Sequence, residues 1–213
     1  MKAIIFSGPS LPPTSITIEG PEWRPPLRQG DLYRAALEDP TALGVIDGFF
    51  DTTPTVWHEE ILFALDRGIA VHGAASIGAL RAAELDVFGM RGIGVIYEWF
   101  RDEKLQDDDE VAVLSAPAEL GYQPLSEPMV NIRATVERVM SRRLINAEIG
   151  RLIVDLAKSM FFKQRTWDAV YASLRQHLSH QEVTELERIL TINYVDQKRA
   201  DAILLLQTIK ELV

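Results

Sequence analysis

The sequence predicts an α/β protein whose sheet is mainly parallel. Three short apolar runs, at residues 3–6, 44–47 and 69–72, have the length and composition of strands, and segments with helical periodicity lie between them. Strands that alternate with helices form parallel sheets covered by helices. These observations favour a Rossmann- or flavodoxin-like core. From residue 126 onward only helical patterns remain, which adds an all-helical C-terminal module.

The first half of the chain supplies the strands and the helices that connect them. Residues 9–30 carry six prolines and predict a long irregular segment, and residues 31–37 predict a short helix. Thr53-Pro54 predicts the start of the next helix, because Thr is a frequent cap and Pro a frequent first residue. The buried stripe expected on that helix consists of Trp57, Ile61, Ala64 and Leu65.

The second half reads as a series of helices. The glycines at 89, 92 and 94 predict a turn, and residues 111–115 predict one more strand. Among the helices that follow, Ser179 and Glu182 form a capping box, and Asp196 is expected to cap the last helix. We therefore expect an α/β core domain at residues 1–122 and a helical module at residues 123–213 that packs on it.

Composition excludes several classes of function. The 213 residues carry a net charge of −9 without a basic stripe, which argues against nucleic-acid binding. The absence of cysteine excludes disulfides, thiolate chemistry and a persulfide on this chain. With only four histidines and no glycine-rich dinucleotide motif in the required context, we expect neither a metal nor a cofactor. No apolar run has the length of a membrane span, so we expect a cytoplasmic protein.

Ser76 stands where serine nucleophiles often stand. An apolar run is followed by tiny residues, the serine and a helix at residues 77–85, a layout that places a hydroxyl beside helix amides able to stabilise an oxyanion. The match to G-x-S-x-G is loose because Ala74 occupies the first glycine position. A helix cap is the alternative role for Ser76, since serine is a preferred capping residue.

Other candidates surround this serine. His58 begins its helix and could act as a general base, or be an ordinary half-exposed histidine. Asp47 and Gly48 end a strand, where they either hold a turn or supply a site carboxylate and an oxyanion-hole amide. Arg81 and Glu84 lie three apart on one helix, so they form a surface ion pair or bind an anionic substrate group.

Two further groups of polar residues lie nearer the helical module. The acidic run at residues 107–110 is typical of a solvated loop, with a docking surface for a basic partner or a weak divalent-cation site as alternatives. Asn131 and Arg133 cluster with Glu127 at the first turn of a helix. Capping and the helix dipole account for Glu127 better than for the other two, which makes these two candidates for substrate binding.

With these residues assembled, the chain resembles the TfuA-like proteins. The 73–85 segment, Gly-Ala-Ala-Ser-Ile-Gly-Ala-Leu-Arg-Ala-Ala-Glu-Leu, is the most specific part of the resemblance. The other matching segments are residues 6–11, 24–26, 30–31, 45–50, 56–62, 108–113 and 126–133. The family pattern often has a second serine immediately before the one matched by Ser76, whereas this chain has Ala75.

The resemblance implies a role in sulfur chemistry. TfuA-like proteins accompany YcaO enzymes in the formation of backbone thioamides, some of them in ribosomally made peptides of the trifolitoxin type. They are thought to supply sulfide by cleaving a thiocarboxylated, ThiS-like sulfur carrier. On this basis Ser76 is the expected nucleophile or water-positioning group and His58 the expected base. Gly48 and Ile77 would supply amides, with Asp47, Arg81, Glu84, Asn131 and Arg133 as further substrate-binding residues.

Two rival interpretations remain open at this stage. The chain could be a non-catalytic adaptor that activates or tethers YcaO, or a generic small-molecule serine hydrolase without a YcaO partner. The expected partners are therefore a YcaO enzyme and the sulfur carrier, with neither nucleic acid nor membrane. The sequence leaves the oligomeric state open, a homo-oligomer included.

Overall fold

The chain divides into two compact units. The computed structural model describes residues 2–12, 20–50 and 53–212, so part of the proline-rich segment expected at 9–30 lies outside the described residues. The sheet unit comprises residues up to 108 together with 115–123 and 198–213, and the helical unit comprises residues 109–114 and 124–197. The domain boundary expected after residue 122 stays a prediction, but the compact units group the last helix with the sheet.

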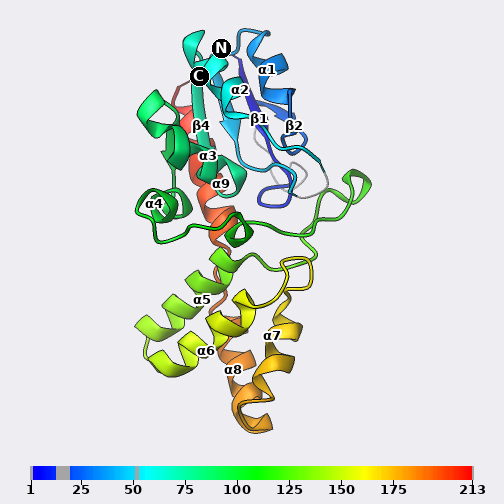
Figure 1. Ribbon diagram of the computed structural model, residues 1–213, viewed down its shortest axis with the longest axis vertical. Helices are drawn as coiled ribbons and strands as arrows, with labels where there is room; N and C mark the ends of the chain where they lie inside the picture. Colours follow the sequence, from blue (N-terminus) through cyan, green and yellow to red (C-terminus); the bar gives the residue numbers. More distant parts are fainter. Residues whose placement is uncertain (1, 13–19, 51–52, 213) are drawn as a thin grey trace. The chain divides into compact units, whose positions relative to one another are not determined.

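The sheet unit is built on parallel strands, as the sequence predicts. Within the described residues the sheet has five strands in the order β2-β1-β3-β4-β5, all parallel (Figure 1). This is the 2-1-3-4-5 order of flavodoxin-like folds. The strands are β1 (Ala3–Phe6), β2 (Glu22–Arg24), β3 (Ala42–Val45), β4 (Ala70–Ala74) and β5 (Arg91–Ile93).

Helices cover both faces of this sheet. On one face, α1 (Asp31–Ala36), α2 (His58–Asp66) and α3 (Ile77–Leu85) bury side chains against the strands. The other face is covered by α9 (Gln197–Lys210) (Figure 1). The residues of α9 that are buried there are Ala202, Leu205, Leu206 and Ile209. The unit also contains α4 (Val95–Arg101) and the short 3₁₀ helices η2 (Asp86–Phe88) and η4 (Ala118–Leu120), while η3 (Asp108–Glu110) crosses from one unit to the other.

A glycine on β3 allows α9 to approach the sheet closely. A Cβ atom at Gly44 would lie 2.8 Å from Ile209 Cδ1 and 3.1 Å from Leu205 Cδ2. Any larger residue at position 44 would push these leucine and isoleucine side chains out of their packing. The strand therefore depends on glycine for a steric reason, although glycine is otherwise a poor strand former.

The helical unit has the helices that the sequence predicts. They are α5 (Met129–Ser141), α6 (Ala147–Lys158), α7 (Trp167–Leu174) and α8 (His180–Ile192), and they share one apolar core. The capping box of α8 is confirmed, because the Ser179 hydroxyl accepts from the Glu182 amide while the Glu182 carboxylate accepts from Ser179. None of the helices in the described part of the chain has both the length and the apolar character needed to cross a bilayer.

Four local predictions are wrong. Residues 111–114 form no strand but a loop, whereas residues 91–93, within the stretch predicted as a turn, form β5. The predicted start at Thr53-Pro54 is also wrong, because α2 begins at His58 after Trp57. The segment before the helix pairs instead with another loop, where the Pro54 carbonyl accepts from the Gln29 amide at 3.0 Å. Trp57, expected in the buried stripe, is 57% exposed.

The docking of α9 can be tested with two neighbouring leucines. Leu205 is fully buried against the sheet, whereas Leu204 is 44% exposed on the same helix. We expect Leu205→Ala to lower the free energy of unfolding by about 2–5 kcal/mol, since it leaves a cavity under the sheet. Leu204→Ala should cost less than about 1 kcal/mol. Chemical denaturation of both variants measures this difference, and equal losses would contradict the packing of α9 on this face.

A buried histidine predicts a pH-dependent stability. His72 on β4 is fully buried, and neither ring nitrogen has a hydrogen-bond partner among the described residues. Burial, with a smaller effect from Arg91, lowers the pKa of His72. Above about pH 6.5 both folded and unfolded states hold the ring neutral. As the pH falls below that value only the unfolded state gains the proton, so stability falls by at most about 1.4 kcal/mol per pH unit.

The substitution His72→Leu isolates this effect. The difference in free energy of unfolding between the wild type and His72→Leu should be constant above about pH 7 and should change in favour of the variant as the solution is acidified. Denaturant titrations between pH 7.5 and pH 5 measure it. A difference that is the same at every pH would mean that the folded and unfolded states take up the proton with the same pKa, and would contradict the prediction.

Candidate functional site

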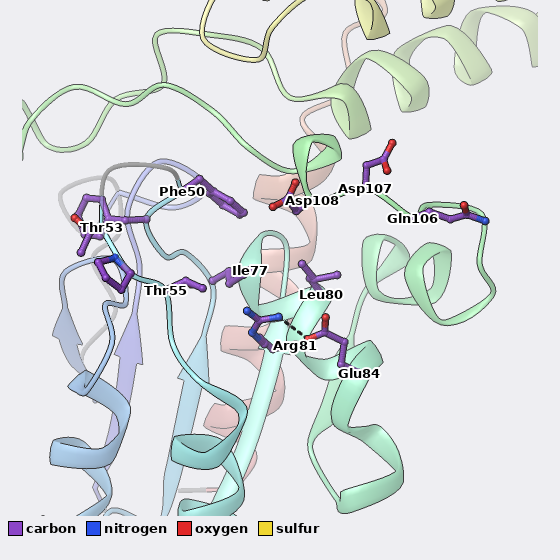
Figure 2. A pocket seen from close by; sticks show the side chains of 12 residues that line it. Phe50, Thr53, Thr55, Ile77, Leu80, Arg81, Glu84, Gln106, Asp107 and Asp108 are labelled. Atoms are coloured by element: carbon purple, nitrogen blue, oxygen red, sulfur yellow. Dashed lines mark hydrogen bonds and ion pairs between the residues drawn. The ribbon is translucent and has the colours of Figure 1, made fainter.

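A pocket of about 730 Å³ lies beside α3 in the sheet unit (Figure 2). Its walls come from the segment after β3, from α3 itself and from the segment after α4. The lining residues are Phe49, Phe50, Thr53, Pro54, Thr55, Ile77, Leu80, Arg81, Glu84, Gln106, Asp107 and Asp108. Apolar and charged side chains share this surface, and the volume suits a small ligand or the end of a peptide chain.

Tiny residues bring α3 against the strands. A Cβ atom at Gly73 would lie 2.1 Å from the Gly78 carbonyl oxygen, and one at Gly78 would lie 1.9 Å from the Val45 carbonyl oxygen. Ala75 completes the turn with a φ of 66°, a left-handed conformation that is unusual for a residue with a side chain. The turn places the start of α3 at the carboxyl ends of β3 and β4, where parallel sheets bind their ligands.

Ser76 lies inside this turn and does not line the pocket. It is the N-cap residue of α3, but its side chain accepts no capping hydrogen bond from the described part of the helix. The residue is 1% exposed. Ile77, the next residue, does reach the pocket and packs on Gly48, where a Cβ atom would lie 2.8 Å from Ile77 Cγ2. The catalytic role of Ser76 and the amide roles of Gly48 and Ile77 stay predictions.

Two of the predicted site residues, Arg81 and Glu84, line the pocket, and a third, His58, does not line it but contacts Glu84. Glu84 Oε2 accepts a hydrogen bond from Arg81 Nη1 at 2.6 Å and lies 2.8 Å from His58 Nε2 (Figure 2 shows the arginine and the glutamate). The His58 side chain is 45% exposed, whereas that of Arg81 is 13% exposed. The buried Nε of Arg81 has no hydrogen-bond partner among the described residues. One carboxylate oxygen therefore holds both an imidazole and a guanidinium that retains donor capacity.

Asp47 connects two loops at the edge of the sheet. Its Oδ2 accepts from the amides of Gly8 and Ser10 at 2.9 and 3.0 Å, and its Oδ1 accepts from the Ser10 hydroxyl at 2.6 Å. Lys198 Nζ on α9 lies 3.9 Å from Oδ1, and both side chains are buried. This bonding favours Asp47 as a residue that holds a turn. Nothing near Lys198 in the chain distinguishes it from a surface lysine of a helix, so the sequence does not predict its place beside Asp47.

The comparison with protein families decides the family. A family model described as TfuA-like protein matches residues 47–166, more than half of the chain. The chain belongs to the TfuA-like family. The search of the curated proteins finds no match. Membership supports an accessory role beside a YcaO enzyme in thioamide formation.

Two more predicted site residues of this TfuA-like chain lie in the helical unit. Asn131 is buried, and its Nδ2 donates to the Tyr194 hydroxyl at 2.9 Å and to Asp196 Oδ1 at 3.3 Å. The Tyr194 hydroxyl donates in turn to Glu127 Oε1 at 2.7 Å. Burial and the neighbouring Glu127 carboxylate raise the pKa of Tyr194 far above its ordinary value, so the phenol stays protonated. These bonds tie the start of α5 to the end of α8 within one unit.

Part of the acidic run also belongs to the helical unit. Glu110 is buried and accepts two hydrogen bonds from Arg133, at 2.8 and 2.9 Å. This bonding, opposed by partial burial, raises the pKa of Arg133. Asp109 pairs with Lys158 and, at 2.7 Å, with the fully buried Arg165. The expectation of a solvated loop is therefore wrong for Asp109 and Glu110.

The pairing of Arg133 predicts a stability role for it in the TfuA-like chain. Arg133→Gln removes a two-pronged ion pair from the buried Glu110 carboxylate, so it should lower the free energy of unfolding by about 2 kcal/mol. Arg188, which pairs with Glu185 on an exposed face of the same unit, is the matched control. Arg188→Gln should cost less than about 0.5 kcal/mol. Denaturation of both variants measures the difference, and an unaltered stability of Arg133→Gln would restore it as a candidate for substrate binding.

Proposed function

We propose that this TfuA-like chain releases sulfide from a thiocarboxylated, ubiquitin-like sulfur carrier and thereby supplies a YcaO enzyme that forms thioamides in a ribosomally made peptide or protein. The observation that carries the proposal is the contact of His58 and Arg81 with one oxygen of Glu84, where Arg81 and Glu84, but not His58, line the 730 Å³ pocket. A base oriented by a carboxylate, next to a guanidinium with a free donor, is a suitable apparatus for acyl hydrolysis. The chain has no cysteine, so it releases sulfur without carrying it as a persulfide.

His58 is the proposed general base. When its Nε2–H donates to Glu84 Oε2, at 2.8 Å, Nδ1 is the nitrogen that can accept a proton. Nδ1 then takes a proton from a water molecule while the water oxygen bonds to the carbonyl carbon of the thiocarboxylate. The carbon–sulfur bond breaks as that proton passes to sulfur, which leaves as hydrosulfide. The carrier ends in a carboxylate, and the second proton of the water enters the solvent.

Arg81 is the proposed contact for the reacting anion. A thiocarboxylate is anionic before and after the attack, and its charge concentrates on the carbonyl oxygen in the tetrahedral intermediate. The Arg81 guanidinium is largely buried and has one donor nitrogen without a partner among the described residues. A charged donor in a poorly hydrated position stabilises such an oxyanion more strongly than the same donor in water.

The residues around Arg81 indicate the chemistry of the carrier tail that precedes the thiocarboxylate. Glu84, Asp107 and Asp108 also line the pocket, so carboxylates outnumber the guanidinium there (Figure 2). The rest of the bound tail should therefore offer hydrogen-bond donors, such as backbone amides or a basic side chain. The apolar side chains of Phe50, Ile77 and Leu80 would contact its less polar atoms. A flexible peptide tail fits these requirements better than a compact anion.

Ser76 is the alternative nucleophile, but its burial makes a direct role in the reaction harder. Its hydroxyl is sealed in the turn, so a nucleophile role would require residues 75–77 to open when the carrier binds. The same burial favours the second candidate function, a non-catalytic adaptor that binds and activates YcaO. A generic serine hydrolase would need the same opening, and would react with a fluorophosphonate at Ser76 without a YcaO partner.

Sulfide release from a purified thiocarboxylated carrier separates these candidates. We expect His58→Gln to slow release by about 100-fold or more, because general-base catalysis contributes that much. Ser76→Ala should change the rate by less than about threefold if water attacks directly. His177→Gln, at an exposed histidine of the helical unit, is the control and should match the wild type.

Each contrary result points to a different function. A wild-type protein that releases no sulfide but still accelerates YcaO would establish the adaptor. A large loss in Ser76→Ala with an intact His58→Gln would make the serine the nucleophile and would overturn the water mechanism.

A further inference from the structure

A second pocket lies at the carboxyl ends of β1 and β2, apart from the one beside α3. It has a volume of about 380 Å³, within the range of small-ligand sites. Its lining residues are Phe6, Arg24, Pro25, Pro26, Arg28, Asp31, Arg34, Glu38 and Tyr122. Three arginines around one small pocket are notable in a chain whose net charge is −9. None of the residues proposed for sulfide release lines this pocket.

Among the described residues, each charged side chain around this second pocket has an oppositely charged partner, with one exception. Lys2 and Arg24 together neutralise Glu22 and Glu38, with nitrogen–oxygen distances of 2.6–3.0 Å. Arg34 pairs with Asp31 at 2.6 Å. Arg28 is left over, since its guanidinium has no carboxylate partner in the described part of the chain. The pocket therefore carries one excess positive charge, which a single anionic group would balance.

Aromatic rings hold this arginine in place. The Arg28 guanidinium carbon lies 4.6 Å from the centre of the Phe49 ring, and the Phe49 ring meets the Tyr122 ring edge-on at 6.4 Å. Such stacking orients a guanidinium and leaves its in-plane N–H groups available for an oxyanion. The Tyr122 hydroxyl has no hydrogen-bond partner among the described residues, so a second donor is also free.

The backbone at Tyr122 is strained. Its φ is 57°, and the preceding Gly121 is also left-handed, with a φ of 69°. A bulky residue in this conformation costs about 1 kcal/mol or more, and such strain concentrates at binding and catalytic sites. The residue in this strained turn lines the pocket together with Phe6, Pro25 and Pro26.

We propose that the second pocket binds a small molecule that carries one oxyanion on an apolar body. Arg28 and Tyr122 hold the oxyanion, and Phe6 with the two prolines contacts the apolar part. A carboxylate and a phosphate ester share this chemistry. The proposal is independent of sulfide release, because the two pockets use different charged residues.

Isothermal titration with three probes of similar size tests this site. Benzoate and phenyl phosphate represent the two sources of an oxyanion, and benzyl alcohol lacks the charge. We expect one of the two anions to bind with a Kd of about 1 mM, as a small ligand with one strong polar contact does. Benzyl alcohol should not bind measurably. The preferred anion tells whether a carboxylate or a phosphate ester is the natural group.

Substitutions in each of the two pockets show which pocket binds the anion. Arg28→Gln should weaken it about tenfold and Tyr122→Phe about threefold, since a hydrogen bond to a charged group is worth more than a neutral one. Neither change removes a core contact or an ion pair, so both variants should fold. Arg81→Gln is the essential control, because it alters only the pocket beside α3 and should leave the affinity unchanged.

Several outcomes would overturn the proposal. Benzyl alcohol that binds as well as the anions would leave no role for the charge of Arg28. Anion binding that Arg81→Gln abolishes and Arg28→Gln leaves intact would belong to the other pocket. The absence of saturable binding of both anions by the wild-type chain, at concentrations up to about 20 mM, would exclude the site, since the expected Kd is far lower.

Discussion

The need to bury a parallel sheet on both faces determines how this chain is arranged. Parallel strands with apolar side chains on both sides are stable only when helices cover each side. The helices that follow β2, β3 and β4 all pack on one face, and the other face carries Ile5, Ala42 and Ala74. Helix α9 covers that face, so the last residues of the chain complete a core begun by the first ones.

The return of α9 also shapes the polar edge of the sheet. It brings Lys198 near Asp47, and it brings Asp201 to the start of α4, where the carboxylate accepts from the Ile96 amide at 2.8 Å. The strand order reverses between β1 and β3, the place where flavodoxin-like sheets bind ligands. Here the Asp47 carboxylate already occupies the amides of Gly8 and Ser10 after β1. The open pockets consequently lie on either side of this point, beside α3 and beside β2.

Sequence patterns predicted the parts of the structure that depend on residues close together in the chain. Helical periodicity located α5 to α8, and the Gly- and Ala-rich 73–85 segment located the turn into α3. The pattern could not show that α9 belongs to the sheet, because that contact joins residues more than 100 positions apart. Residues 111–115 have strand-forming side chains but pair with no strand of the sheet in the described part of the chain, whereas β5 contains Gly92 and forms because β4 offers an edge. At the site, His58, Arg81 and Glu84 were predicted, but ion pairs such as that of Arg133 depend on distant partners.

The backbone strain of the α3 turn falls on Ala75 and not on Ser76. In a turn that displays a nucleophile, the strained residue is the one whose side chain projects from the sheet edge. Here that residue carries only a methyl group, which is fully buried, while the hydroxyl of the next residue also faces inward. The turn thus serves to pack α3 tightly against β3 and β4. The same helix also carries Arg81 and Glu84 to the pocket, and for this reason we propose a water molecule activated by His58, and not the serine, as the nucleophile.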